Sequence, residues 1–221
     1  MVRWFCGSIG VMDASKIRGL YVIIDPEACR GREPVGVARL ALEGGASVVQ
    51  WRDKRREKGD QLSEARAVRE LCREHDAVFI VNDHIELALA VGADGVHLGP
   101  HDLPVEVARR LAPEGFIVGA STNNAAEARA AEAGGASYVA VGSVFPTASK
   151  APERTRAASP AVLREVKSAV SVPVVAIGGI DASNVGEVIE AGADAVAVIR
   201  AVCGAEDVRA AARELARRFA R

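Results

Sequence analysis

Eight short apolar segments alternate with helix-like stretches along this chain, and this alternation limits the possible folds more than any other feature. The segments are rich in valine and isoleucine and almost continuously apolar, as is typical of parallel strands buried on both faces. We expect strands over Leu20–Asp25, Ser47–Gln50, Val78–Val81, Gly95–Leu98, Phe116–Ala120, Tyr138–Gly142, Pro173–Ile177 and Ala195–Ile199. We expect helices between them, among others over Leu62–Arg73, Val105–Leu111, Ala125–Ala133, Ala161–Ala169, Val185–Ala191 and Asp207–Ala220. Such βα units predict an α/β fold with a single (β/α)₈ TIM barrel.

An internal repeat agrees with this barrel. A Gly-Ala pair that ends a helix and opens an even-numbered strand recurs at Gly45, Gly92, Gly135 and Gly192. The glycine suits the left-handed backbone that terminates a helix, and the small residue after it lets the strand pack closely. Gly-Ala pairs are common in any α/β protein, but this register is regular. The competing open, doubly wound sheet usually carries a glycine-rich loop after its first strand, whereas Asp25-Pro26-Glu27 follows it here.

The chain contains no linker-like segment between its elements. Its 221 residues therefore predict one barrel domain over residues 19–221, preceded by an N-terminal extension over residues 1–18. The apolar residues of the extension are too few and too interrupted for a secretory signal or a membrane span. The extension is either a helical lid over the bottom of the barrel or an artefact of the translation start, with Met12 as the true start.

The charge balance limits the class of ligand, and the cysteine content indicates the redox environment. The net charge is -1, from 28 basic and 29 acidic residues, which argues against nucleic acid and against a membrane surface. The four cysteines are widely spaced, without the spacing of zinc ligands, as expected for reduced thiols. We therefore expect a cytoplasmic protein that binds small molecules. The sequence leaves the oligomeric state open, and a homo-oligomer is one possibility.

Polar clusters occur at the downstream ends of five expected strands. They are Gln50–Lys54, Asn82-Asp83, His101-Asp102, Ser121-Thr122 and Pro146–Lys150. The strand ends of a parallel barrel surround a single mouth, where enzymes of this fold keep their chemistry. We therefore expect residues from all five clusters to meet at that mouth.

The first cluster has the pattern of a phosphate-binding site. Gln50, Arg52 and Lys54 are two residues apart, so in an extended segment their side chains point to the same side. Arginine binds phosphate in a planar fork and lysine binds it as a point charge. The alternative is a solvated charged loop, since Arg55 and Arg56 follow directly.

Asp83 and Asp102 are the candidate metal ligands. Mg²⁺ usually takes one or two protein carboxylates and completes its octahedron with water and phosphate oxygens. The alternative is that both aspartates cap the helices that follow them, a common role for this residue. The histidines His84, His97 and His101 lack the spacing of a helical metal site, and His97 is expected to be a satisfied core or mouth residue.

The later strand ends contribute a long loop and a glycine pair. The segment from Gly142 to Pro152 is rich in hydroxyl groups and carries one lysine, which favours a functional lid over an ordinary surface loop. Gly178-Gly179 and Ile199-Arg200 follow the last two strands, where barrels often bind phosphate on backbone amides.

With these clusters in order, the chain resembles the thiamine-phosphate synthase family from about Gly19 to Val202. The family's Gln-x-Arg-x-Lys segment is matched by Gln50, Arg52 and Lys54, its Asn-Asp pair by Asn82 and Asp83, and its second metal aspartate by Asp102 after His97-Leu98-Gly99. Its pocket serine falls on Ser121, its Pro-Thr-x-Thr-Lys loop on Pro146 to Lys150, and its glycine pair on Gly178-Gly179. The chain departs from the family at Pro100-His101, Ser149 and Arg200, and none of these changes removes a required charge or ligand.

The resemblance implies a reaction and a set of roles. The family joins 4-amino-2-methyl-5-(diphosphooxymethyl)pyrimidine to 4-methyl-5-(2-phosphooxyethyl)thiazole, giving thiamine phosphate and diphosphate. By resemblance, Asp83 and Asp102 hold Mg²⁺, and Arg52, Lys54, Ser121 and Lys150 are the catalytic residues. The pyrimidine diphosphate would contact Gln50, Trp51, Arg52, Asp53, Lys54, Asn82, Ser121 and Lys150. The thiazole phosphate would contact Thr147, Ala148, Ser149, Gly179, Ile199 and Arg200.

Two rival functions remain at this stage. A thiazole tautomerase of the same fold needs a proton-shuttling group, such as a histidine just past the pocket serine, but Thr122-Asn123-Asn124 follows Ser121. A non-catalytic barrel that only binds phosphorylated ligands would be expected to have lost a metal ligand or a cation. All of these residues are present here.

Overall fold

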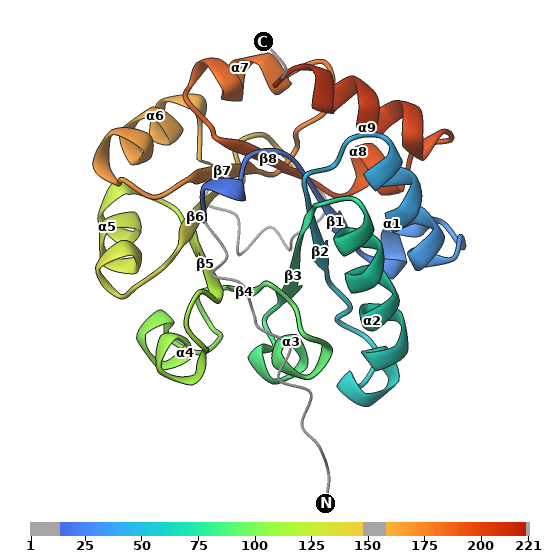
Figure 1. The fold of residues 1–221 in the computed structure, drawn as a ribbon. Coiled ribbons are helices and arrows are strands. Elements are labelled where there is room, and N and C mark those ends of the chain that lie inside the picture. The colour runs from blue at the N-terminus through green and yellow to red at the C-terminus, as the bar shows by residue number, and fades with distance from the viewer. Residues whose placement is uncertain (1–13, 148–157, 220–221) are drawn as a thin grey trace, which may run out of the picture.

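Eight parallel strands form a closed barrel in the order in which they occur along the chain (Figure 1). The structure is a computed structural model and describes residues 14–147 and 158–219. Parallel pairing of β8 with β1 closes the ring, which confirms the TIM barrel and excludes the open sheet. The strands are β1 (Gly19–Ile24), β2 (Val48–Trp51), β3 (Val78–Asn82), β4 (Gly95–Leu98), β5 (Ile117–Thr122), β6 (Tyr138–Gly142), β7 (Val174–Ile177) and β8 (Ala195–Val198).

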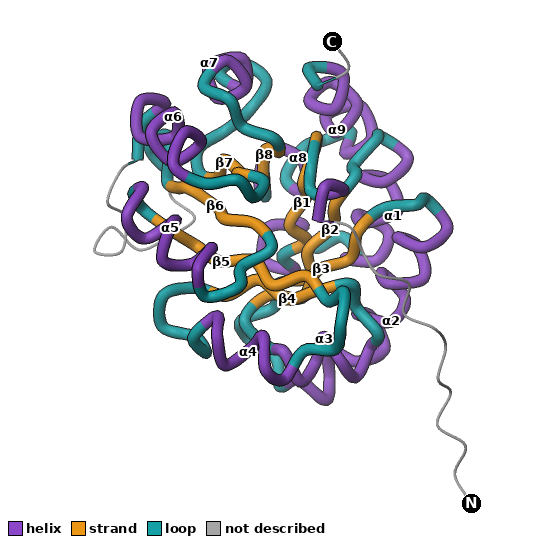
Figure 2. The backbone as a smooth tube through the Cα atoms, turned by 60° about the vertical axis from the view of Figure 1, so that its left-hand side comes forward, coloured by secondary structure: helices purple, strands orange, loops and turns teal. Residues whose placement is uncertain are grey.

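Helices follow the strands and surround the barrel on its outside (Figures 1 and 2). The helices expected from the sequence correspond to α2, α4, α5, α6, α7 and α9, and α2 begins a turn earlier than expected. The helices are α1 (Pro34–Glu43), α2 (Lys58–Glu74), α3 (Ile85–Val91), α4 (Val105–Leu111), α5 (Ala125–Ala133), α6 (Pro160–Ala169), α7 (Val185–Glu190), α8 (Arg200–Cys203) and α9 (Val208–Arg217). Two 3-10 turns, η1 (Ala14–Lys16) and η2 (Pro26–Cys29), flank β1.

Alternate residues of each strand contribute to two separate apolar layers. Val48 and Ile80 belong to a cluster inside the barrel. Val49 and Phe79 belong to a larger cluster between the strands and the helices. Both layers are buried, which explains why the strands are almost continuously apolar. The same alternation decides which side chains at the strand ends face the mouth.

The Gly-Ala repeat lies at the opposite end of the barrel from the mouth. Gly45, Gly92, Gly135 and Gly192 have φ values of 102°, 67°, 97° and 94°, the left-handed region expected for them. In three copies the side chain of the third residue accepts a hydrogen bond from a backbone amide at the start of a neighbouring strand. These bonds run from Phe79 to Asp94 (2.8 Å), from Val118 to Ser137 (3.1 Å) and from Val174 to Asp194 (2.7 Å).

The segment before β1 contributes to the inside of the barrel. Ile17 is fully buried and belongs to the same inner cluster as Tyr21 and Val48. Within the described part of the N-terminal extension, Ile17 therefore packs against the barrel interior, whereas Ser15 and Arg18 are exposed.

Candidate active site

Strand β2 directs successive predicted site residues to opposite sides. Gln50 points into the barrel, where its amide nitrogen donates a hydrogen bond to the Tyr21 hydroxyl at 2.7 Å. Trp51 points outward and is only 1% exposed, within the outer apolar cluster. Arg52 lies just after the strand and forms an ion pair with Asp25, which follows β1. Gln50 and Trp51 therefore face opposite sides of β2.

Trp51 and Asp53 hold the loop between β2 and α2. The indole N–H of Trp51 donates to Gln61 Oε1 at 3.0 Å, and Gln61 Nε2 donates to the carbonyl oxygen of Arg56 at 2.8 Å. Asp53 accepts hydrogen bonds from the amide of Arg55 (2.9 Å) and from the guanidinium of Arg56 (2.5 Å). With these side chains engaged, a contact of Trp51 or Asp53 with a diphosphate would come from the backbone.

Two predicted cations each meet a carboxylate from an adjacent strand. Arg52 forms an ion pair with Asp25, which follows β1, and the two side chains are only 21% and 10% exposed. Lys54 Nζ lies 3.3 Å from Asp83 Oδ2, which follows β3. The description as a solvated loop fits Arg55, whose side chain is 75% exposed, but not Arg52.

Asp83 and Asp102 are brought together at the mouth. Burial first, and then the neighbouring Asp83 carboxylate, raise the pKa of Asp102. Neither aspartate has the capping role considered from the sequence, because His84 and Pro104 occupy the N-cap positions of α3 and α4. Asp102 instead accepts a hydrogen bond from the amide of Gly99 at 2.7 Å. Asp83 has a φ of 62°, which is uncommon for a residue with a side chain.

This pair of acids fits a magnesium ion. Two carboxylates held together repel one another, and a divalent cation between them would remove that repulsion. Within residues 14–147 and 158–219, no group of three or more His, Cys, Asp or Glu side chains forms a metal site. Two carboxylates nevertheless satisfy Mg²⁺, which takes its remaining ligands from water and phosphate.

Ser121 and Asn82 flank a buried histidine on the inner side of the mouth. The Ser121 hydroxyl lies 2.9 Å from His97 Nε2, and His97 Nδ1 lies 2.9 Å from the Tyr138 hydroxyl. His97 is therefore the satisfied mouth residue that the sequence indicated. Asn82 is the partner of His97 in the pairing of β3 with β4.

The loops after β6 and β7 lie against one another. The amide of Phe145 donates to the carbonyl oxygen of Gly178 at 3.0 Å. Gly179 has a φ of 67°, and a Cβ there would lie 2.5 Å from the carbonyl oxygen of Pro146. Only glycine fits this close approach, so the loop that leads to Thr147 is held beside Gly179.

The remaining predicted thiazole-phosphate residues lie at the end of β8 or outside the described residues. Ile199 is the N-cap of α8, and Arg200 is exposed in its first turn. Because Ile177 pairs with Ala197, the ends of β7 and β8 bring Gly179 and Ile199 to neighbouring positions. The remaining predicted loop residues, Ala148, Ser149 and Lys150, fall in the segment 148–157, outside the described residues.

Three polar residues of the barrel interior were not predicted as site residues. Asp25 is 7% exposed and anchors Arg52, and its position at the end of β1 was a signal for it. Tyr21 and Tyr138 are buried inside the barrel with their hydroxyls 3.0 Å apart. The signal for the tyrosines was the strand alternation, which places an aromatic hydroxyl among inward-facing positions of β1 and β6.

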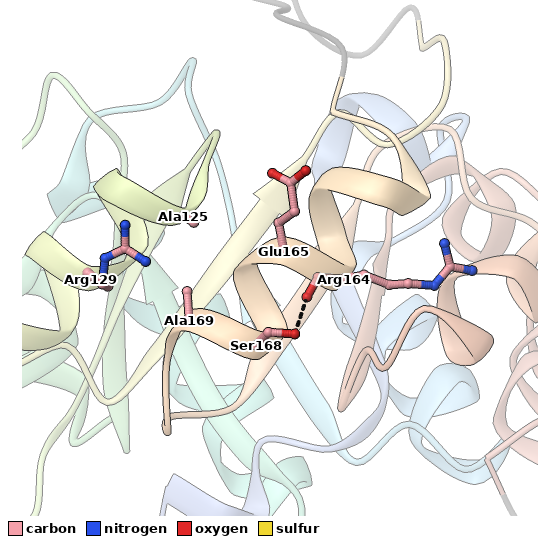
Figure 3. Close-up of a pocket in the computed structure, with 6 residues that line it drawn as sticks. All are labelled: Ala125, Arg129, Arg164, Glu165, Ser168 and Ala169. Carbon is pink, nitrogen blue, oxygen red and sulfur yellow. Dashed lines mark hydrogen bonds between the residues drawn. The ribbon is translucent and has the colours of Figure 1, made fainter.

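A surface hollow on the outside of the barrel contains none of the predicted site residues. It lies between α5 and α6 and is lined by Ala125, Arg129, Arg164, Glu165, Ser168 and Ala169 (Figure 3). Ser168 donates there to the carbonyl oxygen of Arg164, one helical turn before it. The convergent polar groups instead lie at the barrel mouth, which we take as the candidate active site.

A closed parallel barrel with cations and carboxylates around its mouth defines a (β/α)₈ enzyme of phosphorylated small molecules. The family model described as "Thiamine monophosphate synthase" matches residues 20–202. The chain belongs to the thiamine-phosphate synthase family, and it is a transferase of thiamine biosynthesis. No described helix combines the length and the apolar character needed to cross a membrane.

Individual relatives agree with this assignment. The thiamine-phosphate synthase of Methanoculleus marisnigri is 53% identical over 91% of this chain and 95% of its own length. The solved thiamine phosphate pyrophosphorylase of Pyrococcus furiosus superposes with a TM-score of 0.86 at 44% identity, covering 94% of this chain and 97% of that one. A 3-hexulose-6-phosphate synthase, at 20% identity and a TM-score of 0.67, shares the fold.

Proposed function

We propose that the enzyme condenses 4-amino-2-methyl-5-(diphosphooxymethyl)pyrimidine with 4-methyl-5-(2-phosphooxyethyl)thiazole, releasing thiamine phosphate and diphosphate with the assistance of Mg²⁺. The observation that carries the proposal is the alternation of charge over three adjacent strand ends. Asp25, Arg52, Lys54 and Asp83 form two ion pairs there, and Asp102 adds a further carboxylate. Such an arrangement holds a metal diphosphate in one orientation.

The chemistry requires charge stabilisation rather than a strong base. As the diphosphate leaves the methylene carbon, negative charge grows on its oxygens, and the electron-rich aminopyrimidine stabilises the cation that remains. Arg52 is held by Asp25 before the substrate arrives, so little reorganisation of its guanidinium is needed when this charge develops. Mg²⁺ held by Asp83 and Asp102 would neutralise the diphosphate as it departs.

The second substrate would occupy the other side of the mouth. The loop start at Thr147, the backbone at Gly179 and the β8 end at Ile199 and Arg200 are the candidate thiazole-phosphate contacts. This placement would align the thiazole nitrogen with the reacting carbon. The new bond would then form between two substrates already bound next to one another, rather than in a bimolecular encounter. Lys150, in the loop that continues from Thr147, would close over the diphosphate and exclude water that traps the cation.

A coupled assay tests the proposal directly. The purified protein is mixed with both phosphorylated precursors and Mg²⁺, and thiamine phosphate and diphosphate are quantified. We expect equal amounts of the two products, loss of the reaction in EDTA, and recovery on adding excess Mg²⁺. Binding of both precursors without any product would instead identify a non-catalytic barrel, and isomerisation of the thiazole phosphate alone would identify a tautomerase.

Substitution of the carboxylates separates a metal role from a structural one. Asp83→Asn and Asp102→Asn should each lower the rate by roughly 10²-fold or more while leaving the unfolding transition in place, because both residues lie in loops. Asp76→Asn, on the exposed turn after α2, is the matched control. Full activity of the double variant in EDTA would refute the metal site.

A further inference from the structure

Four buried side chains and the half-buried Ser121 form one continuous chain of hydrogen bonds across the inside of the barrel. Gln50 Nε2 lies 2.7 Å from the Tyr21 hydroxyl, which lies 3.0 Å from the Tyr138 hydroxyl. The Tyr138 hydroxyl lies 2.9 Å from His97 Nδ1, and His97 Nε2 lies 2.9 Å from the Ser121 hydroxyl. The members come from β2, β1, β6, β4 and β5, so the chain joins residues that are far apart in the sequence.

The middle of this chain is well shielded from water. Tyr21 and Tyr138 are 1% and 0% exposed, and burial, as the largest cause, raises the pKa of both phenols well above the ordinary value. Each phenol therefore keeps its hydrogen and has one to donate. The Tyr138 ring also stacks on His97, with ring centroids 5.5 Å apart. A Cβ on Gly119 would lie 2.1 Å from the Tyr138 ring, so the absence of a side chain there makes room for the tyrosine.

With the Gln50 amide nitrogen facing Tyr21 and His97 neutral, counting hydrogens gives the direction of the whole hydrogen-bond chain. Gln50 contributes an N–H, so the Tyr21 oxygen accepts and its hydrogen points to Tyr138. Tyr138 then accepts from Tyr21 and gives its own hydrogen to His97 Nδ1. A neutral imidazole that accepts at Nδ1 carries its hydrogen on Nε2, and it donates that hydrogen to Ser121.

The hydrogen-bonding roles of Gln50 and Ser121, at the two ends of the hydrogen-bond chain, are consequently linked. With its nitrogen committed to Tyr21, Gln50 presents its carbonyl oxygen as an acceptor to a ligand. With its oxygen accepting from His97, Ser121 presents its hydrogen as a donor. While His97 is neutral, reversing either end requires the Gln50 amide to rotate and every hydrogen in the hydrogen-bond chain to move, because any mixed arrangement leaves a polar group unpaired.

We propose that this directional chain, with His97, Tyr138 and Tyr21 as positioning residues, sets the ligand edge that the mouth accepts: a hydrogen-bond donor facing Gln50 beside an acceptor facing Ser121. A 4-aminopyrimidine has this edge, since its amino group donates and the adjacent ring nitrogen accepts. A 4-oxopyrimidine has the reverse edge, with an accepting oxygen beside a ring N–H. The choice of aminopyrimidine as the ligand rests on the proposed function, whereas the direction of the chain does not.

The direction can be tested without substrate. ¹⁵N-edited NMR of the uniformly labelled, full-length protein distinguishes the two neutral histidine tautomers, and His97 is assigned by its through-space contacts to the Tyr138 ring. We expect the tautomer with hydrogen on Nε2. A His97 ring with hydrogen on Nδ1 would show that the chain runs the other way and would overturn the proposal.

Two tyrosine variants form a matched pair for this measurement. Tyr138→Phe and Tyr21→Phe each remove one buried hydroxyl, but only the first removes the hydrogen donated to His97 Nδ1. Tyr138→Phe should therefore allow a mixture of tautomers, whereas Tyr21→Phe should keep the hydrogen on Nε2. An unchanged tautomer in Tyr138→Phe would overturn the proposal. The wild-type spectrum decides the direction even where a variant does not fold.

The ligand-facing half of the proposal is tested with two substrates. The ratio of kcat/KM for the aminopyrimidine diphosphate to that for its 4-oxo analogue should fall about tenfold in Tyr138→Phe, the loss expected for one misdirected hydrogen bond. The KM for the thiazole phosphate should stay within about twofold of the wild-type value. An unchanged ratio would overturn the specificity role. If neither substrate gave product while His97 carried its hydrogen on Nε2, the proposed function would be refuted. The direction of the hydrogen-bond chain would still be supported.

Discussion

Lys54 Nζ lies 3.3 Å from Asp83 Oδ2, so a cation from the end of β2 is already paired with an acid from the end of β3. The lysine side chain is half exposed and the aspartate is largely buried, with exposures of 50% and 18%. Lys54 is therefore placed where it can neutralise Asp83 in the absence of ligand and turn to a diphosphate when one binds.

Lys54→Gln removes this cation with little change in size. We expect kcat to fall by roughly 10²-fold at saturating Mg²⁺, because a positive charge next to the leaving diphosphate is lost. Steady-state kinetics with both substrates measures the effect, and the exposed Lys58→Gln on α2 is the control. Equal effects of the two variants would mean that Lys54 acts only through general surface charge.

Arg52→Ala should slow the reaction more than it weakens binding of the thiazole phosphate. The guanidinium is held by Asp25 at the ends of β1 and β2, two residues before Lys54, the other cation assigned to the diphosphate. Its charge is therefore expected to act on the departing diphosphate, which lowers kcat and kcat/KM together. Initial rates with varied thiazole phosphate provide the measurement. A loss confined to thiazole-phosphate affinity would show that the two phosphate sites are assigned the wrong way round.

Gln61→Leu should destabilise the fold by about 1–3 kcal/mol, because it leaves the buried Trp51 indole N–H without its acceptor. Urea denaturation of Gln61→Leu, Trp51→Phe and the double variant forms a thermodynamic cycle. Trp51→Phe removes the donor, so the double variant should be less destabilised than the sum of the two single changes. Additive effects would show that this hydrogen bond carries no coupling energy.

The stability contribution of Glu132 should depend on pH. Hydrogen bonds from the hydroxyl and amide of Ser171, and from the amide of Val172, outweigh burial and lower the pKa of this carboxyl group. A lowered folded-state pKa gives stability above the unfolded value of about 4.3, and that stability is lost as the pH falls through the folded value.

Glu132→Gln should therefore reduce the free energy of unfolding by roughly 0.5–1 kcal/mol at pH 7, a modest amount because the site is largely open to solvent. The difference from wild type should shrink below about pH 4. Chemical denaturation across this pH range measures it, with the exposed Glu114→Gln as the control. A difference that stays constant with pH would exclude the charged group as its origin.

The strand pattern predicted the barrel and the residues at its mouth because both follow from local sequence. Buried strands require continuous apolar segments, and the Gly-Ala repeat marks the starts of the even-numbered strands. The proximity of Asp83 to Asp102 followed once the strands were placed, since the ends of β3 and β4 are neighbours in any barrel of this order.

Contacts across the barrel could not be predicted in the same way. Whether Tyr21 meets Tyr138 depends on the tilt and stagger of strands that are not neighbours, and no local pattern encodes this. Trp51 shows a second limit. It lies within a motif whose residues were predicted to face the ligand, yet the alternation of β2 directs its side chain to the helices. The family pattern identified the segment, while the strand geometry decides what each side chain does.

The separation of the two apolar layers has a consequence for how such an enzyme can change. The larger cluster lies between the strands and the helices, while Gln50, His97 and Ser121 place polar groups inside the barrel. Most of the apolar burial that opposes unfolding is therefore located away from the substrates. Mutations that alter the hydrogen-bonding groups inside the barrel can accumulate while the outer layer preserves the fold, so new substrate preferences can arise on the same scaffold.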